Sequence, residues 1–140
     1  MPDNRDKVRT IFAVLAGLLF FLAAEIGASL AARAFWPGYA EAAINRSYSL
    51  PMLIARLMVG ALATIGSGWV ASRISGNPRN AALSFGVALF AISLVWHINI
   101  WPEYPAWYHL VWLGCIIPGA VLGSRLSLKG AEPLAGYDRA

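Results

Sequence analysis

Four apolar stretches, each close to the roughly 20 residues that cross a bilayer as a helix, most strongly constrain how this chain can fold. They cover approximately residues 10–32, 52–72, 80–100 and 106–126. Breaks rich in proline and glycine separate them: WPGYAEAAINRSYSLP, RISGNPRN and WPEYP. We therefore predict an all-α membrane protein in which four transmembrane helices form an antiparallel up-down bundle, within one integral membrane domain.

The composition leaves no room for a separate soluble domain. Of the 140 residues, 59% are hydrophobic and only 13% are charged, which is typical of a chain that lies mostly in a membrane. The first apolar run follows MPDNRDKVRT, but at about 23 residues it is longer than the apolar core of a signal peptide. We expect an uncleaved first helix, with residues 1–9 and 127–140 as cytoplasmic tails.

Basic residues at the helix ends indicate the orientation of the chain. The net charge is +4, yet no basic stripe, zinc-ligand spacing or RNA-binding motif accompanies it, so we expect no nucleic-acid partner. The basic residues of the tails and of the second connection share one side: Arg5, Lys7, Arg9, Arg73, Arg79, Arg125, Lys129 and Arg139. On the other side Glu41 and Glu103 balance Arg33 and Arg46. We predict that both termini are cytoplasmic, in a bacterial cytoplasmic (inner) membrane.

Aromatic residues gather where the predicted helices meet the outer membrane interface. Trp and Tyr favour this depth because one part of each ring is apolar and another can hydrogen-bond to headgroups or water. We interpret the following residues as interfacial anchors: Trp36, Trp96, Trp101, Trp107 and Tyr108. Tyr39, Tyr48, Tyr104 and Trp112 lie in the same zone and have the same interpretation.

One ionisable residue from each helix falls inside an apolar span: Glu25, Arg56, His97 and His109. At about 1.5 Å per residue, Glu25 lies roughly 6 Å outward from its helix centre, and the other three lie roughly 9–10 Å outward. An unpaired charge in hydrocarbon costs about 2.5–3.5 kcal/mol or more. We therefore expect a polar cluster in which Glu25 pairs with Arg56. It is either a salt bridge that fixes helix register or a functional site open to the outside.

Helical spacing places small residues on the same faces as these ionisable groups. Arg56 shares its face with Gly60, Thr64, Ser67 and Ala71. His97 shares its face with Ser93, Gly86 and Ala82, and His109 lies over Gly119 or Ala120 and Gly123. Small residues mark helix contacts in membranes because they allow close backbone approach. The ionisable side chains should therefore point into the bundle.

Two further features concern the second half of the chain. Pro118 falls in mid-helix, where it removes a backbone hydrogen bond, so we predict a kink there. The segments VASRISG (70–76) and LGSRLSLKG (122–130) close the second and fourth helices in similar ways. This similarity is compatible with two duplicated helical hairpins or with a chance match of short motifs.

Recognisable catalytic motifs are missing from the sequence. It contains no nucleophile elbow, Walker loop, HExxH or CxxC, and its one cysteine, Cys115, excludes an intrachain disulfide. His97 and His109 could hold haem or a metal between adjacent helices, but ligands beside a tight turn would lie near the surface. We predict a protein that is not an enzyme, with no catalytic residue, metal or cofactor.

A nine-residue segment, LAAEIGASL (22–30), resembles part of the first helix of the small multidrug resistance transporters. The resemblance implies that a glutamate, here Glu25, exchanges protons for cationic drugs in a dimer of four-helix chains. The glycine follows Glu25 at a spacing that differs by one residue from that family. Arg56 and the histidines have no counterpart there, so we assign no family.

Three functions are compatible with these features. The first is a non-enzymatic accessory or assembly subunit that binds a membrane-protein partner or itself. The alternative is a homo-oligomeric proton-coupled transporter or ion pathway that uses the outer cluster. It would require a dimer, because one four-helix bundle should have little room for a cavity. The third is a protein that binds a cofactor or a lipid headgroup through its outer aromatic and histidine residues.

Overall fold

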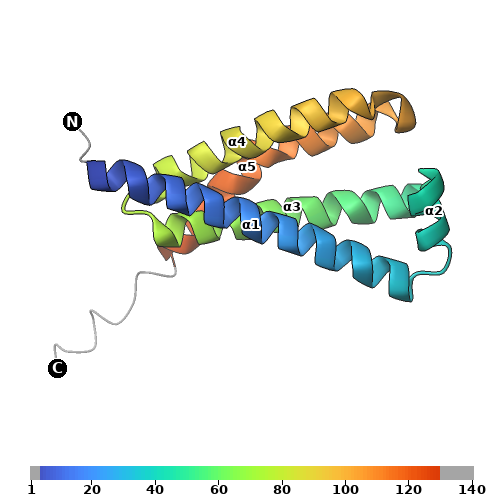
Figure 1. Cartoon of the computed structure of the whole chain (residues 1–140), viewed down its shortest axis with the longest axis horizontal. Coiled ribbons are helices and arrows are strands. Elements are labelled where there is room, and N and C mark those ends of the chain that lie inside the picture. The colour runs from blue at the N-terminus through green and yellow to red at the C-terminus, as the bar shows by residue number, and fades with distance from the viewer. Residues whose placement is uncertain (1–3, 130–140) are drawn as a thin grey trace.

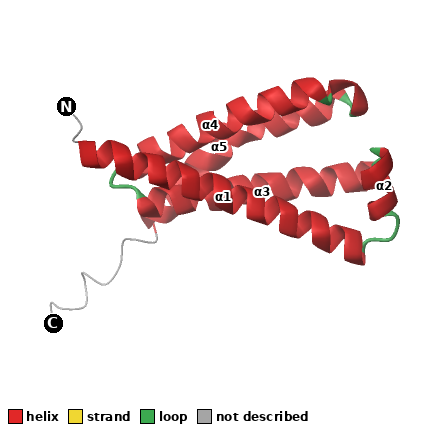
Figure 2. Cartoon of the chain, viewed as in Figure 1, coloured by secondary structure: helices red, strands yellow, loops and turns green. Residues whose placement is uncertain are grey.

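The computed structural model describes residues 4–129, which form helices and short connections without any strand (Figure 2). Its elements are α1 (Asn4–Phe35), α2 (Tyr39–Asn45), α3 (Leu50–Ile74), α4 (Pro78–Asn99), the 3-10 helix η1 (Trp101–Glu103) and α5 (Ala106–Lys129). Within this part of the chain, α1, α3, α4 and α5 are long and apolar enough to cross a membrane. Four such helices indicate an integral membrane protein. Residues 1–3 and 130–140 of the two predicted tails, including Arg139, lie outside the described residues.

The long helices share two ends (Figure 1). The start of α1, the α3–α4 connection and the last turn of α5 lie together at one end, which we call the basic end. We call the other the α2 end, because it holds α2 and η1. Helix α3 packs most extensively against α5 and α1. Toward the α2 end, the α4–α5 pair diverges from the α1–α3 pair.

The predicted small-residue faces are the contact faces between the helices. On α3 and α4 their members are all buried: Gly60, Thr64, Ser67, Ala71, Ala82, Gly86 and Ser93. The approach of α3 to α5 is very close, since a Cβ added at Gly68 would lie 2.8 Å from the Cα of Ala120. The prediction that small residues mark the helix contacts is confirmed.

The first break contains a short helix that the sequence analysis did not predict. Gly38 precedes α2 in the left-handed conformation, with φ of 78°, which glycine adopts without steric cost. The segment YAEAAIN is rich in alanine, the strongest helix former, and buries Tyr39 and Ala42 against the rest of the chain. Helix formation therefore continues locally after the proline–glycine break. As a consequence, α2 holds its first residue, Tyr39, against α3.

Prolines and an asparagine define several helix boundaries. Pro51 lies in the first turn of α3, and Pro78 lies in the first turn of α4, whose cap Asn77 accepts a hydrogen bond from the Asn80 N–H. Helix α5 continues through Pro118 from Ala106 to Lys129. The kink at Pro118 and the duplication of the hairpins stay predictions.

Candidate functional site

A cavity of about 720 Å³ lies between α1 and α4 near the α2 end, and we call it the α1–α4 cavity. Ligand pockets in proteins have volumes of about 300–1,000 Å³. Its polar and aromatic lining is Glu25, Arg56, Ser93, Trp96, His97, Asn99, Tyr104, Tyr108 and Trp112. Its apolar lining is Leu18, Phe21, Leu22, Leu89, Ile92, Val95 and Ile100. Several lining side chains are more than half exposed, so this cavity is a groove that opens at the surface of the bundle.

Arg56 is bound by tyrosines from three different segments. Its Nε donates to the Tyr108 hydroxyl at 3.3 Å, and its Nη1 donates to the hydroxyls of Tyr39 at 3.1 Å and Tyr48 at 3.3 Å. The guanidinium also lies 4.8 Å from the centre of the Tyr48 ring, a cation–π distance. Arg56 thus connects α3 to α2, to the α2–α3 connection and to α5.

Glu25 does not form the predicted ion pair with Arg56. Within residues 4–129 the structure has one ion pair, between Arg46 and Glu103 at the α2 end. Glu25 is half-buried, and its Oε1 is buried without a hydrogen-bond partner in the described chain. It lines the α1–α4 cavity together with Arg56, and both also line a neighbouring cavity of about 50 Å³. The pairing was wrong because the guanidinium is bound by tyrosines instead.

The two histidines are in direct contact. Their Nδ1 atoms are 2.7 Å apart and both rings are buried. One Nδ1 must therefore carry a proton and the other must accept it, so the two rings are different tautomers when neutral. Two nitrogens bound to a tetrahedral zinc at about 2.0–2.1 Å would lie about 3.3–3.4 Å apart, so the observed separation is that of a hydrogen bond and not of a zinc site. The expectation that histidines beside this turn lie near the surface was wrong, because both are buried, and His97 also lines the α1–α4 cavity.

Aromatic rings enclose the histidine pair. Trp101 stacks on His109 with ring centroids 4.5 Å apart and planes at 15°. Trp112 lies 5.7 Å from the centre of the His97 ring. The Nε2 of His109 is buried and has no hydrogen-bond partner in the described part of the chain. This end of the bundle therefore holds a buried polar pair within an aromatic shell.

The aromatic residues predicted as membrane anchors divide into two groups. Trp96 is 65% exposed, and Trp101 and Trp107 are also exposed, as residues that meet lipid headgroups would be. Tyr108 is only 2% exposed, so its interpretation as an interfacial anchor was wrong. Trp36 is half-buried and packs beside Tyr39.

Tyr39 and Tyr48 are the site residues whose role the sequence analysis missed. Both were interpreted as membrane anchors, although each accepts a hydrogen bond from Arg56. Tyr104, in the connection before α5, lines the α1–α4 cavity. Burial raises the pKa of its hydroxyl although Arg56 acts in the opposite direction, so Tyr104 stays neutral. The only indication of this role in the sequence was that Tyr39 and Tyr48 lie close to Arg56 along the chain.

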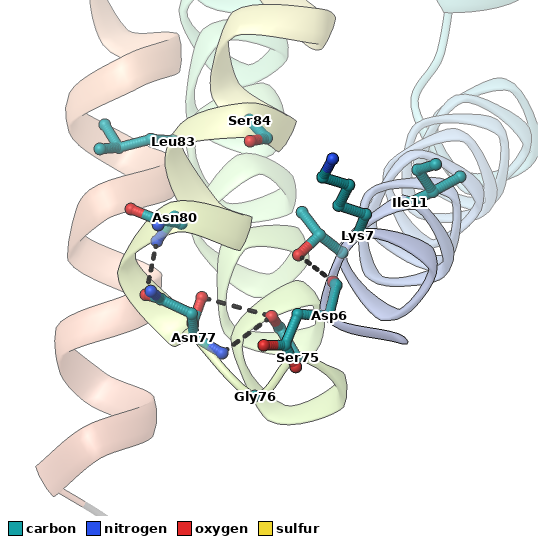
Figure 3. A pocket seen from close by; sticks show the side chains of 10 residues that line it. Asp6, Lys7, Ile11, Ser75, Gly76, Asn77, Asn80, Leu83 and Ser84 are labelled. Atoms are coloured by element: carbon teal, nitrogen blue, oxygen red, sulfur yellow. Dashed lines mark hydrogen bonds between the residues drawn. The ribbon is translucent and has the colours of Figure 1, made fainter. Parts of the chain in front are cut away.

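A second large cavity, of about 600 Å³, lies at the basic end between the start of α1 and the start of α4 (Figure 3). Several of its polar groups, on Thr10, Ser75 and Asn77, are engaged in local hydrogen bonds. Asn77 receives a bond from the Asn80 N–H at 3.3 Å and donates its own N–H to Ser75 at 3.1 Å. Thr10 donates to the carbonyl of Asp6 at 2.9 Å. These contacts are those of a helix cap and a turn, so the α1–α4 cavity is the stronger candidate site.

Comparison with known proteins identifies no relative that could assign a function. No protein-family model matches the chain, and no curated protein or solved structure is significantly similar to it. In the described residues no group of three or more histidine, cysteine or acidic side chains is arranged to hold a metal ion. Functional inference therefore rests on the geometry of the α1–α4 cavity.

Proposed function

We propose that this chain is a non-enzymatic accessory membrane protein that binds an amphiphilic molecule in the α1–α4 cavity. The observation that carries the proposal is the polarity of the cavity lining. Glu25, Arg56 and His97 lie at its α2 end. From these residues toward the basic end, the lining consists of apolar side chains as far as Leu18 on α1 and Leu89 on α4. This apolar part is roughly 10–12 Å long at the helical rise.

This distribution resembles that of a membrane lipid, which has its polar headgroup at the interface and its chains toward the bilayer centre. Leu22, Ile92 and Trp96 line the cavity and are all more than half exposed. The cavity therefore reaches the surface of the bundle that faces the membrane. A ligand that moves laterally within one leaflet can enter it without crossing water.

The orientation that fits this proposal is an antiparallel up-down bundle with its α2 end outside and both termini in the cytoplasm of a bacterial inner membrane. The basic end carries Arg5, Lys7, Arg9, Arg73, Arg79 and Arg125. At the α2 end, the basic Arg46 is paired with Glu103. An excess of Lys and Arg is typical of the cytoplasmic side.

Cysteine labelling in intact cells tests this orientation. Replacing Cys115→Ser removes the one native thiol, after which Ser47→Cys and Gly76→Cys place single thiols at the two ends. A membrane-impermeant maleimide should label Ser47→Cys in intact cells and Gly76→Cys only after permeabilisation. The opposite labelling pattern would place the cavity in the cytoplasmic leaflet.

Native mass spectrometry tests ligand binding and the accessory role together. Protein extracted gently from its own membrane should retain one amphiphilic molecule per chain and should be part of an assembly with another membrane protein. Leu22→Trp and Ile92→Trp would fill the cavity and should abolish retention. Leu19→Trp, on the exposed face of α1 away from the lining, is the matched control. A wild-type protein without any bound amphiphile would exclude the proposed function.

A second candidate function is proton-coupled transport, and Glu25 is the observation that favours it. A buried carboxylate oxygen without a partner, beside a cavity that also contains His97, is the arrangement of a group that takes up and releases a proton. Proteoliposomes with an internal pH-sensitive dye provide the test. Proton flux in the wild type that Glu25→Gln abolishes would support transport, and equal flux in the two proteins would remove it.

A further inference from the structure

We propose that the ligand of the α1–α4 cavity is a zwitterionic phospholipid with a primary ammonium group, of the phosphatidylethanolamine class. The inference rests on the proposed function, because it names the amphiphile that the cavity binds. Its basis is that two side chains of opposite charge, Glu25 and Arg56, line one cavity without pairing with each other. A headgroup that carries both charges would complement both side chains at once.

Arg56 retains hydrogen-bonding capacity that suits a phosphate. A guanidinium has five N–H groups, one on Nε and two on each Nη. The Nε proton and both Nη1 protons are directed to tyrosine hydroxyls, so the two protons of Nη2 have no partner among the described residues. The tyrosines hold the guanidinium in one orientation, and an oriented guanidinium binds phosphate oxygens well.

Glu25 supplies the complementary acceptor for an ammonium group. Its Oε1 is buried and lacks a hydrogen-bond partner in the described chain, so this oxygen can accept a hydrogen bond from a ligand. A primary ammonium brings three N–H donors and a positive charge to this oxygen. A trimethylated ammonium, as in phosphatidylcholine, brings the charge without a donor, and is therefore expected to bind less well.

The cavity also argues against lipids with a single type of charge. The anionic headgroup of a phosphatidylglycerol would complement Arg56, but it would leave Glu25 unpaired beside the phosphate. A purely cationic amphiphile would complement Glu25 and would be repelled by Arg56. Below the charged groups, Leu18, Phe21 and Leu89 provide an apolar path for an acyl chain toward the middle of the bundle.

Competition between lipids measured by native mass spectrometry tests the inference. The full chain is delipidated in detergent and mixed with equal amounts of dioleoyl-phosphatidylethanolamine, dioleoyl-phosphatidylglycerol and dioleoyl-phosphatidylcholine. We expect retention of the ethanolamine lipid at about ten times the level of either competitor. Glu25→Gln keeps the size of the side chain and should reduce this preference to less than threefold. Glu41→Gln, on the exposed side of α2, is the matched control and should keep the full preference.

Each outcome separates this inference from the proposed function. Equal retention of the three lipids, or a preference for phosphatidylglycerol, would overturn the headgroup assignment while the proposed amphiphile binding stands. Retention of no lipid would overturn both. An unchanged preference in Glu25→Gln would also overturn the inference, because the discrimination would then come from groups other than the carboxylate. Thermal unfolding of the variant, compared with the wild type, confirms that the same fold is present in both samples.

Discussion

The two ends of the bundle use their polar side chains in different ways. At the basic end, most side-chain hydrogen bonds join close neighbours in sequence, such as Thr10 with Asp6 and Asn77 with Ser75 and Asn80, and one, from Arg9 to the carbonyl of Ile74, joins α1 to the end of α3. At the α2 end they join distant segments, since Arg56 and Tyr108 are separated by 52 positions and Arg46 and Glu103 by 57. Local contacts form with the helix ends themselves, whereas the distant ones require the bundle to be assembled first.

The ends also differ in how completely their buried polar atoms are paired. Among the described residues, the buried side-chain atoms without a partner are Glu25 Oε1, Glu103 Oε2 and His109 Nε2, and all three lie toward the α2 end. A buried polar atom without a partner costs about 1–3 kcal/mol. Such groups are rare in proteins, and a bound ligand, an ordered water or ion, or a catalytic role can account for them. The contrast therefore supports a structural role for the basic end and a functional role for the α2 end.

Removing Arg56 should have the largest effect, because it is the centre of the polar contacts at the α2 end. Arg56→Ala removes three hydrogen bonds and leaves the buried Tyr108 hydroxyl without a partner. We expect a loss of about 3 kcal/mol in the free energy of unfolding, measured by denaturation in mild detergent. Arg73→Ala, which removes an exposed arginine beside Trp69 at the basic end, should cost much less. Equal losses in the two variants would contradict the difference between the ends.

The sequence was sufficient to predict the four long helices and their contact faces, although not the short helix α2. Apolar length located the four spans, and the three- and four-residue spacing of Gly60, Thr64 and Ser67 identified the buried face of α3. The histidine contact was predictable for a similar reason. His97 and His109 flank a short turn, so adjacent helices carry them to the same depth. Each of these predictions depends only on local geometry.

The partners of Arg56 were beyond the sequence because they depend on tertiary structure. Tyr39 reaches Arg56 only because the unpredicted helix α2 folds against α3. Once tyrosines bind the guanidinium, Glu25 is left without the ion pair that charge alone suggested. The α1–α4 cavity likewise depends on how the helix pairs diverge, which hydropathy does not determine. Charge complementarity in the sequence thus predicted an ion pair that the tertiary structure does not form.

Close packing between α3 and α5 should rank second in effect. Gly68→Ala places a Cβ 2.8 Å from the backbone Cα of Ala120, so the helices must move apart. We expect a loss of about 2 kcal/mol in the free energy of unfolding, measured in the same detergent. Gly27→Ala is the control, since a Cβ there meets no atom within 4 Å. A Gly68→Ala protein as stable as Gly27→Ala would show that the helices are not held this closely.

The two histidines should be energetically coupled in the free energy of unfolding, which single substitutions alone cannot show. His97→Phe leaves the Nδ1 of the buried His109 without a partner, and we expect a loss of about 1–2 kcal/mol in the free energy of unfolding. The double variant with His109→Phe should lose less than the sum of the two single variants, because no buried nitrogen is then left unpaired. The measurement is a double-mutant cycle in mild detergent. Additive losses would mean that the two imidazoles do not share a proton.

The cap of α4 should have the smallest effect and should leave the α2 end unchanged. Asn77→Ala removes the side-chain oxygen that accepts the Asn80 N–H, and loss of such a cap typically costs about 1 kcal/mol. Asn77→Asp keeps an acceptor oxygen at the same position and should restore most of this stability. Lipid retention in Asn77→Ala should equal that of the wild type, because the cap lies at the opposite end from the α1–α4 cavity. If the preference among lipids changed with the cap, the two ends would be energetically coupled, and the division into a structural end and a ligand-binding end would not hold.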